Sequence, residues 1–118
     1  MNWIVKFHDK FEAEFDELSA EVQDELLAHA LLLEKFGPQL GRPWVDTLKG
    51  SKHANMKELR FKSRNGVWRV LFAYDPKRQA ILLIAGNKSG MSEMRFYKEL
   101  IKKADERFSN YLADLKKR

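Results

Sequence analysis

Residues 56–75, MKELRFKSRNGVWRVLFAYD, combine a hairpin signal with an unusual set of charges. Asn65-Gly66 stands between two runs in which apolar and polar residues alternate, and this pattern predicts two antiparallel strands joined by a tight turn. Alternation places four charged side chains together on one face, namely Glu58, Arg60, Lys62 and Arg69. Three cations and one carboxylate on one small face suit the binding of a phosphate group.

The chemistry that such a set favours is metal-free cleavage of RNA, in which a ribose 2′-hydroxyl attacks the adjacent phosphate. The protein has to hold the chain in line, neutralise the charge that grows on the phosphate and move protons. Arginine suits this task because its planar fork gives two parallel hydrogen bonds to a phosphate. The chain has no Ser/His/Asp spacing, no glycine-rich phosphate loop and no Cys/His metal pattern, so neither a metal nor another cofactor is expected.

A loop formed by Asn65-Gly66 fixes which residues lie opposite each other. The expected pairs on the charged face are Lys62–Arg69, Arg60–Leu71 and Glu58–Ala73. The other face then supplies the core side chains, which are Leu59, Phe61, Trp68, Val70, Phe72 and Tyr74. Two like charges directly opposite each other destabilise a sheet, so the first pair predicts a bound phosphate. The alternative is that Lys62 simply extends into water.

More basic residues lie on both sides of the hairpin in the sequence. They come from the segment before it, from the end of the apolar run 80–87 and from the start of the last helix, and they are Lys52, His53, Lys57, Lys88, Arg95 and Lys98. We expect these side chains to gather at one rim of the sheet. Of the three histidines, His53 alone is close to the basic cluster in sequence.

The charge of the chain is divided unevenly along its length. Residues 1–36 carry a net charge of −6, residues 37–103 carry +10 and residues 104–118 carry +1. A basic middle section indicates a polyanionic partner, most simply a nucleic acid. The alternative is a solvated surface that aids solubility.

Length and composition limit the class of protein. The 118 residues suffice for one domain, expected to span 1–118. The absence of cysteine excludes disulfides and thiolate chemistry and fits a reducing, cytoplasmic location. No apolar run reaches the roughly 20 residues of a membrane span, and the first residues do not resemble a signal peptide.

Periodicity predicts an α+β fold in the order strand, two helices, three strands, helix. The expected elements are a strand at 3–8, helices at 9–18 and from Ser19 to Gly37, strands at 56–64, 67–75 and 80–87, and a long helix that Ser92 caps. We expect a small, mostly antiparallel sheet with helices on one face. Residues 39–55 are expected to be irregular, with Trp44, Val45 and Leu48 in the core.

Five short motifs resemble the RelE/ParE toxin superfamily, specifically its HigB-like, phage-derived branch. They are LKGS (48–51), NMKELR (55–60), WRVLF (68–72), AGNKSG (85–90) and FYK (96–98). The order of elements is also similar over nearly the whole chain. The resemblance implies the toxin of a type II toxin–antitoxin pair, which enters the ribosomal A site and cuts mRNA without a metal.

The resemblance also implies roles for individual residues. The strand arginines of the family match Arg60 and Arg69, and its basic residue after the strand matches Lys88. Four residues remain candidates for proton transfer, namely Glu58, Lys57, His53 and Tyr97, and Glu58 is equally suited to orienting Arg60. The residues expected to bind RNA are Lys57, Lys62, His53, Arg95, Tyr97 and Lys98.

The implied partners are mRNA, the ribosome and a helix-turn-helix antitoxin, and no membrane is involved. The antitoxin is expected to cover the basic face with acidic or apolar segments. Two other functions stay open: a ParE-like poison of DNA gyrase, and a non-enzymatic basic module that binds RNA or a protein.

Overall fold

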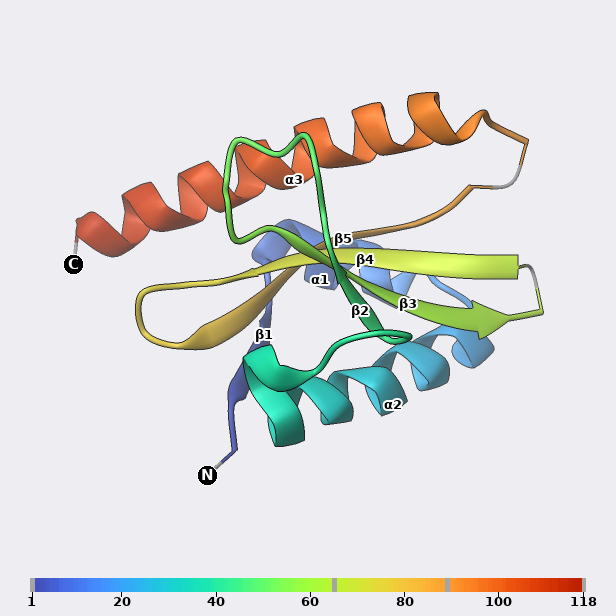
Figure 1. Cartoon of the computed structure of the whole chain (residues 1–118), viewed down its shortest axis with the longest axis horizontal. Coiled ribbons are helices and arrows are strands. Elements are labelled where there is room, and N and C mark those ends of the chain that lie inside the picture. The colour runs from blue at the N-terminus through green and yellow to red at the C-terminus, as the bar shows by residue number, and fades with distance from the viewer. Residues whose placement is uncertain (1, 65, 89, 118) are drawn as a thin grey trace.

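A computed structural model of the chain describes residues 2–64, 66–88 and 90–117 and shows a five-stranded sheet between helices (Figure 1). The helices are α1 (Asp9–Asp16), α2 (Ala20–Phe36) and α3 (Glu93–Lys116), with a 3₁₀ turn at Gly37–Gln39. The strands are β1 (Ile4–Phe7), β2 (Val45–Thr47), β3 (Lys57–Ser63), β4 (Gly66–Tyr74) and β5 (Gln79–Asn87). The predicted α+β class, the order of the predicted elements and the long last helix are confirmed. No helix in the described part of the chain is long and apolar enough to cross a bilayer.

The sheet has the order β1-β5-β4-β3-β2, in which β1 is parallel to β5 and every other neighbour is antiparallel. The strand β5 lies inside the sheet, as its apolar run predicted, and residues 79–84 are buried. The predicted caps also form, because Ser19 Oγ accepts the Val22 N–H and Ser92 Oγ accepts the Arg95 N–H. A polar oxygen at this position satisfies one of the free N–H groups of a helix start.

Helices cover both faces of the sheet, so the prediction of one covered face was wrong. On one face α1 and α2 pack against a core that includes Leu26, Leu59 and Phe72. On the other face α3 packs against a second core that includes Leu71 and Leu83. Figure 1 shows α3 on one side of the sheet and α2 on the other. The face of the sheet that was predicted to be charged is therefore partly covered by α3.

The hairpin β3–β4 forms, but its register differs from the expected one by two residues. Ser63 pairs with Gly66, and Gly66 has a φ of +113°, which favours glycine. The loop therefore consists of positions 64 and 65, of which Asn65 lies outside the described residues. Arg60 now lies opposite Arg69, and the expected Lys62–Arg69 pair does not exist. A shift of two residues keeps every side chain on its predicted face, which is why alternation did not reveal it.

The segment 39–55 contains a strand that the sequence did not predict. Val45 to Thr47 form β2 at the edge of the sheet, and Val45 is buried as expected. Trp44, in contrast, has 41% of its surface exposed, so its predicted place in the core was wrong. The strand is only three residues long, which is too short for a clear alternation.

The start of α3 closes tightly onto β5 because a glycine faces it. A Cβ atom built on Gly86 would lie 2.9 Å from Phe96 Cε1 and 3.1 Å from Leu100 Cδ1. These distances leave no room for a side chain, so Gly86 permits the close approach of helix and strand. Because Gly86 pairs with Arg69 on β4, the first turns of α3 come to lie directly beside the charged strands.

Candidate functional site

Four side chains from β3, β4 and α3 meet beside the first turns of α3, and we call them the Glu58 cluster: Glu58, Arg60, Arg69 and Tyr97. Glu58 lies at the centre and is only 3% exposed. Its Oε2 accepts a hydrogen bond from Arg60 Nη2 at 3.1 Å, and its Oε1 accepts one from the Tyr97 hydroxyl at 2.7 Å. Arg69 Nε lies 3.9 Å from the same Oε1. One carboxylate thus holds two arginines and a tyrosine in place.

Arg69 is held on several sides. Its Nη1 donates to the Val67 carbonyl at 3.2 Å, and its guanidinium carbon lies 5.4 Å from the Phe96 ring centre and 5.7 Å from that of Tyr97. Cations are attracted to aromatic faces at these distances. The side chain of Arg69 is 12% exposed, whereas that of Arg60 is 44% exposed. Arg60 is therefore the guanidinium of the cluster that solvent, or a ligand, reaches most easily.

Protonation in the cluster follows from burial and hydrogen bonding. Burial raises the pKa of Tyr97 above its usual value, and the hydrogen bond to Glu58 raises it further. The hydrogen bond to Glu58 also raises the pKa of Arg60. Tyr97 is therefore a neutral hydrogen-bond donor near pH 7, and Arg60 stays charged. The cluster can stabilise an anion without a change in its own protonation.

Two further cations lie near the cluster along the sheet. Lys62 is exposed and pairs with Val67 on β4, two residues beyond the Arg60–Arg69 pair. Lys88 directly follows Asn87, which is the β5 partner of Trp68, and it is half-buried. Lys62 and Lys88 thus lie at the hairpin end of the sheet, on either side of β4. Of the cations predicted to form one rim, Lys88 lies at this end of the sheet, and its role in binding RNA stays a prediction.

Four of the other predicted residues do not join the cluster. Lys57 alternates with Glu58 and so lies on the opposite face of β3. His53 Nε2 is 2.9 Å from Ser109 Oγ, which is twelve residues, or about 18 Å along α3, from Tyr97. Arg95 and Lys98 are exposed on α3, and Arg95 pairs with Glu99 at 3.4 Å.

The position of His53 has a clear physical cause. Asp105 on α3 is buried and accepts hydrogen bonds from Ser51 Oγ and from the Lys52 N–H at 3.0 Å. These bonds fasten the segment before β3 to the middle of α3, as the loop beside that helix in Figure 1 shows. The bonded residues are more than 50 positions apart in the chain, so no local sequence pattern could predict the contact. The expected gathering of all the cations at one rim was therefore wrong for Lys52 and His53.

Comparison with known proteins decides the family. The family described as "Phage derived protein Gp49-like (DUF891)" matches residues 13–109, which is most of the chain. This protein belongs to the Gp49-like family. The similarity extends to two Mycobacterium tuberculosis proteins, both named as toxins: HigB2, 48% identical over 107 residues, and HigB3, 51% identical over 82 residues. The predicted assignment to the HigB-like, phage-derived branch is thus confirmed.

The coverage of these relatives is uneven. The match includes 89% of this chain but only 52% of HigB2, so this Gp49-like chain spans about half the length of that relative. For HigB3 the match includes 70% of this chain and 69% of the relative.

Solved structures share the fold at low sequence identity. A mutant of the E. coli toxin RelE in the free state superposes with a TM-score of 0.62 and 15% identity, over 91% of this chain and 98% of that one. An archaeal RelE–RelB complex from Pyrococcus horikoshii gives a TM-score of 0.55 and 18% identity, over 76% of this chain and 99% of that chain. The Gp49-like protein therefore has a RelE-like fold.

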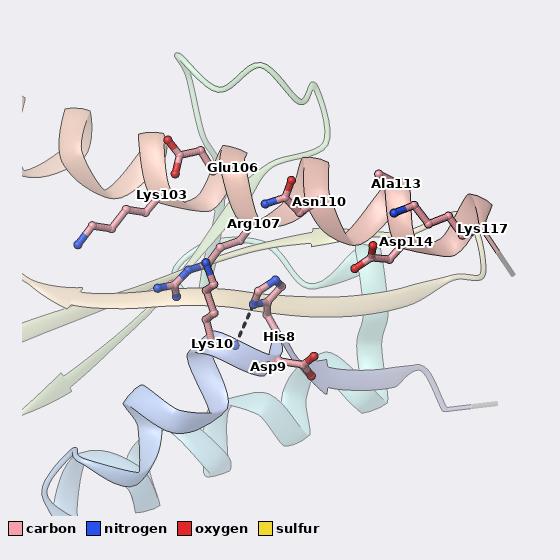
Figure 2. A pocket seen from close by; sticks show the side chains of 10 residues that line it. All are labelled: His8, Asp9, Lys10, Lys103, Glu106, Arg107, Asn110, Ala113, Asp114 and Lys117. Carbon is pink, nitrogen blue, oxygen red and sulfur yellow. Dashed lines mark hydrogen bonds between the residues drawn. The ribbon is translucent and has the colours of Figure 1, made fainter.

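A cleft of about 630 Å³ lies elsewhere on the Gp49-like protein, between the start of α1 and the second half of α3 (Figure 2). None of the side chains that line it belongs to the Glu58 cluster. At its inner wall Arg107 is 9% exposed and donates to both carboxylate oxygens of Glu14 and, at 2.7 Å, to the Leu83 carbonyl. The cleft wall thus contains an ion pair that joins α3 to α1 and β5. In the ranges that the structure describes, no three His, Asp or Glu side chains gather as metal ligands do.

His8 at the edge of this cleft caps α1 in a form that requires a neutral ring. Its Nδ1 accepts the Lys10 N–H at 3.1 Å, which an imidazolium cannot do (Figure 2). Burial lowers the pKa of His8, and the charge of Arg107 lowers it further, although Asp9 and Glu14 oppose this. The unfolded chain therefore takes up a proton near pH 6.5 that the folded chain takes up only at lower pH.

We expect the substitution His8→Asn to flatten the pH dependence of stability. The sign follows from the lowered pKa, because the free energy of unfolding of the native chain falls as the pH drops below about 6.5. Asparagine keeps the cap but does not titrate. Urea unfolding between pH 7.5 and 5.5 measures how the free energy of unfolding changes with pH. The other two histidines are present in both the native chain and the variant, so their effects are shared. Parallel slopes for the two proteins would show that His8 does not titrate differently on folding.

Proposed function

We propose that this protein is the toxin of a type II toxin–antitoxin pair and cuts mRNA in the ribosomal A site. The observation that carries the proposal is the Glu58 cluster, in which a buried carboxylate holds Arg60 and Arg69 on adjacent strands. The relatives HigB2 and HigB3 are named as toxins, and the solved structures of similar fold are RelE proteins. Both facts support the same class of activity.

In the proposed reaction the ribose 2′-oxygen attacks the adjacent phosphorus. The bond between phosphorus and the 5′-oxygen breaks, which leaves a 2′,3′-cyclic phosphate on one fragment and a 5′-hydroxyl on the other. Arg60 and Arg69 bind the phosphate oxygens and stabilise the charge that grows there. Lys62 and Lys88 hold the neighbouring phosphates and so keep the chain in line.

Glu58 is assigned a positioning role in this proposal. A general base has to reach the 2′-hydroxyl within hydrogen-bond distance, but both oxygens of Glu58 already accept bonds from Arg60 and Tyr97 inside the protein. The hydroxyl of Tyr97 stays protonated because its pKa is raised. Its single proton is donated to Glu58 Oε1, so Tyr97 is assigned, like Glu58, to holding the arginines in position. In this proposal the base that removes the 2′ proton and the acid that protonates the leaving 5′-oxygen both lie outside this pair.

A helix-turn-helix antitoxin is the proposed partner. One of the structures of similar fold is a complex of RelE with RelB, which supports the idea that a RelE-like fold binds a second chain. The section 37–103 carries a net charge of +10, so acidic segments of a partner are attracted to it. Bound there, the antitoxin would exclude mRNA from the Glu58 cluster.

Induced expression in cells, followed by pulse labelling, tests this function against the two alternatives. We expect protein synthesis to stop before DNA synthesis does. In a separate assay, the purified chain should leave the supercoiling activity of purified DNA gyrase unchanged. Inhibition of supercoiling would contradict the proposal and favour a ParE-like gyrase poison. RNA binding that weakens steeply with salt but yields no cut RNA would favour a non-enzymatic module.

A further inference from the structure

The residue directly before the edge strand β2 is an aromatic one, and its backbone is bonded to the most exposed arginine of the Glu58 cluster. The Arg60 N–H donates to the Trp44 carbonyl at 2.8 Å, and β2 pairs with β3 so that Val45 lies opposite Leu59. Trp44 is therefore directly opposite Arg60. Neighbouring strands are about 4.8 Å apart, so the two side chains begin within one nucleotide of each other.

Trp44 also lies outside both cores of the protein. Val45 is 4% exposed and belongs to the core under α1 and α2, as Leu59 does. Because side chains alternate along a strand, Asp46 lies on the opposite face, which is the face of Glu58 and Arg60. The helix α3 packs against β4 and β5 on this face. Trp44 comes directly before β2 and belongs to neither core. The indole has 41% of its surface exposed, so a nucleic acid strand bound at Arg60 can reach it.

The backbone at this position is well anchored, which distinguishes Trp44 from an aromatic residue on a free loop. Its N–H donates to the Gly41 carbonyl at 3.1 Å, and its carbonyl accepts from Arg60. On either side of it, Arg42 Nε and Asp46 Oδ2 form an ion pair at 3.2 Å. An exposed indole on an anchored backbone, beside a cation that we propose to bind phosphate, has the two parts of a single-strand binding site, which are a stacking surface and a positive charge.

We infer that Trp44 stacks on a nucleobase of the RNA whose phosphate is bound by Arg60. The inference rests on the proposed function for its substrate and adds the residue that fixes where the chain lies. Every base has an aromatic face, so stacking is tolerant of sequence. Trp44 therefore sets the register of the strand on the cluster, and codon preference has to come from elsewhere.

Binding of a single-stranded adenosine hexanucleotide tests this inference without any need for cleavage. We expect the oligonucleotide to quench the tryptophan emission of the native chain and the quench to disappear in Trp44→Phe. The variant Trp3→Phe is the matched control, because Trp3 packs against Tyr74 and Arg78 away from the cluster and should keep the quench. Affinity should fall by about 5- to 150-fold in Trp44→Ala and by less in Trp44→Phe.

An abasic oligonucleotide with the same phosphates separates stacking from charge. We expect it to bind more weakly than the adenosine hexanucleotide and to give no quench. Equal binding of the two oligonucleotides, or unchanged affinity in Trp44→Ala, would overturn the inference. Weaker binding of a protein partner by Trp44→Ala, with RNA binding unchanged, would also overturn it.

The outcome is distinct from that of the proposed function. If the native chain binds the hexanucleotide with quenching but cuts no mRNA on ribosomes, the stacking role stands and the nuclease proposal fails. If Trp44→Ala cuts mRNA at the same positions and rate as the native chain, the nuclease proposal stands and the stacking role fails.

Discussion

Replacing Arg60 with glutamine is expected to lower the rate of mRNA cleavage on ribosomes by about 100-fold or more. The loss of one preorganised donor to a developing oxyanion has an effect of this size in other enzymes. Glutamine keeps an N–H group for Glu58 Oε2 but removes the charge and the fork. The fold should be preserved because the Arg60 side chain is 44% exposed and lies outside both cores.

The same substitution at Arg64 is the matched control. Arg64 lies on the same hairpin, is 86% exposed and pairs with Glu21 on α2, away from the cluster. We expect Arg64→Gln to cleave at a rate within about twofold of the native rate, because exposed ion pairs contribute little. Equal losses in the two variants would indicate a general effect of charge, and no loss in Arg60→Gln would remove Arg60 from the proposed site.

Replacing Arg107 with alanine is expected to lower the free energy of unfolding by about 2–4 kcal/mol. The substitution leaves the Leu83 carbonyl without its donor, and a buried polar group without a partner costs about 1–3 kcal/mol. The charged hydrogen bonds to Glu14 are lost as well, each of a kind that contributes about 1.5–3 kcal/mol. Glu14 is 48% exposed on its side chain and regains water, which keeps the total below the sum.

Urea unfolding measures this loss, with Lys103→Ala as the control. Lys103 lines the same cleft from the same helix and is exposed, so its removal should change the free energy by less than about 0.5 kcal/mol. A loss below about 1 kcal/mol in Arg107→Ala would mean that the ion pair contributes little to holding α3 on the sheet. The variant should otherwise keep the Glu58 cluster, which lies ten residues away along α3.

Local patterns predicted most of the fold because they act over a few residues. Ser19 and Ser92 are caps, Gly37 ends α2, and the apolar run of β5 is buried in the sheet. Alternation also placed Glu58, Arg60 and Arg69 on one face, and that face carries the cluster. The contact of Tyr97 with Glu58 could not be predicted without knowing where α3 lies. The helical spacing of Tyr97 did predict that its side chain faces the sheet.

The errors arose where distant contacts decide the geometry. Alternation fixes only the parity of strand pairing, so the two-residue shift that puts Arg60 opposite Arg69 was invisible. The buried Asp105 draws the segment with His53 onto α3 over a separation of more than 50 residues. Trp44 looked like a core residue by type, and only the structure of the turn before β2 showed that it is exposed.

The mapping of RNA ends on ribosomes is the direct test of the proposed nuclease activity. Purified protein is mixed with a defined mRNA, once free and once on programmed ribosomes with an empty A site, and new 5′ ends are mapped. We predict that mRNA is cut only on the ribosome and that the new fragments carry 5′-hydroxyl ends. Cleavage should be lost with a folded Arg69→Ala variant. It should also be lost at a nucleotide whose ribose is replaced by 2′-deoxyribose. Intact mRNA in both mixtures, with the native chain shown to be folded, would contradict the proposal, as would undiminished cleavage by Arg69→Ala.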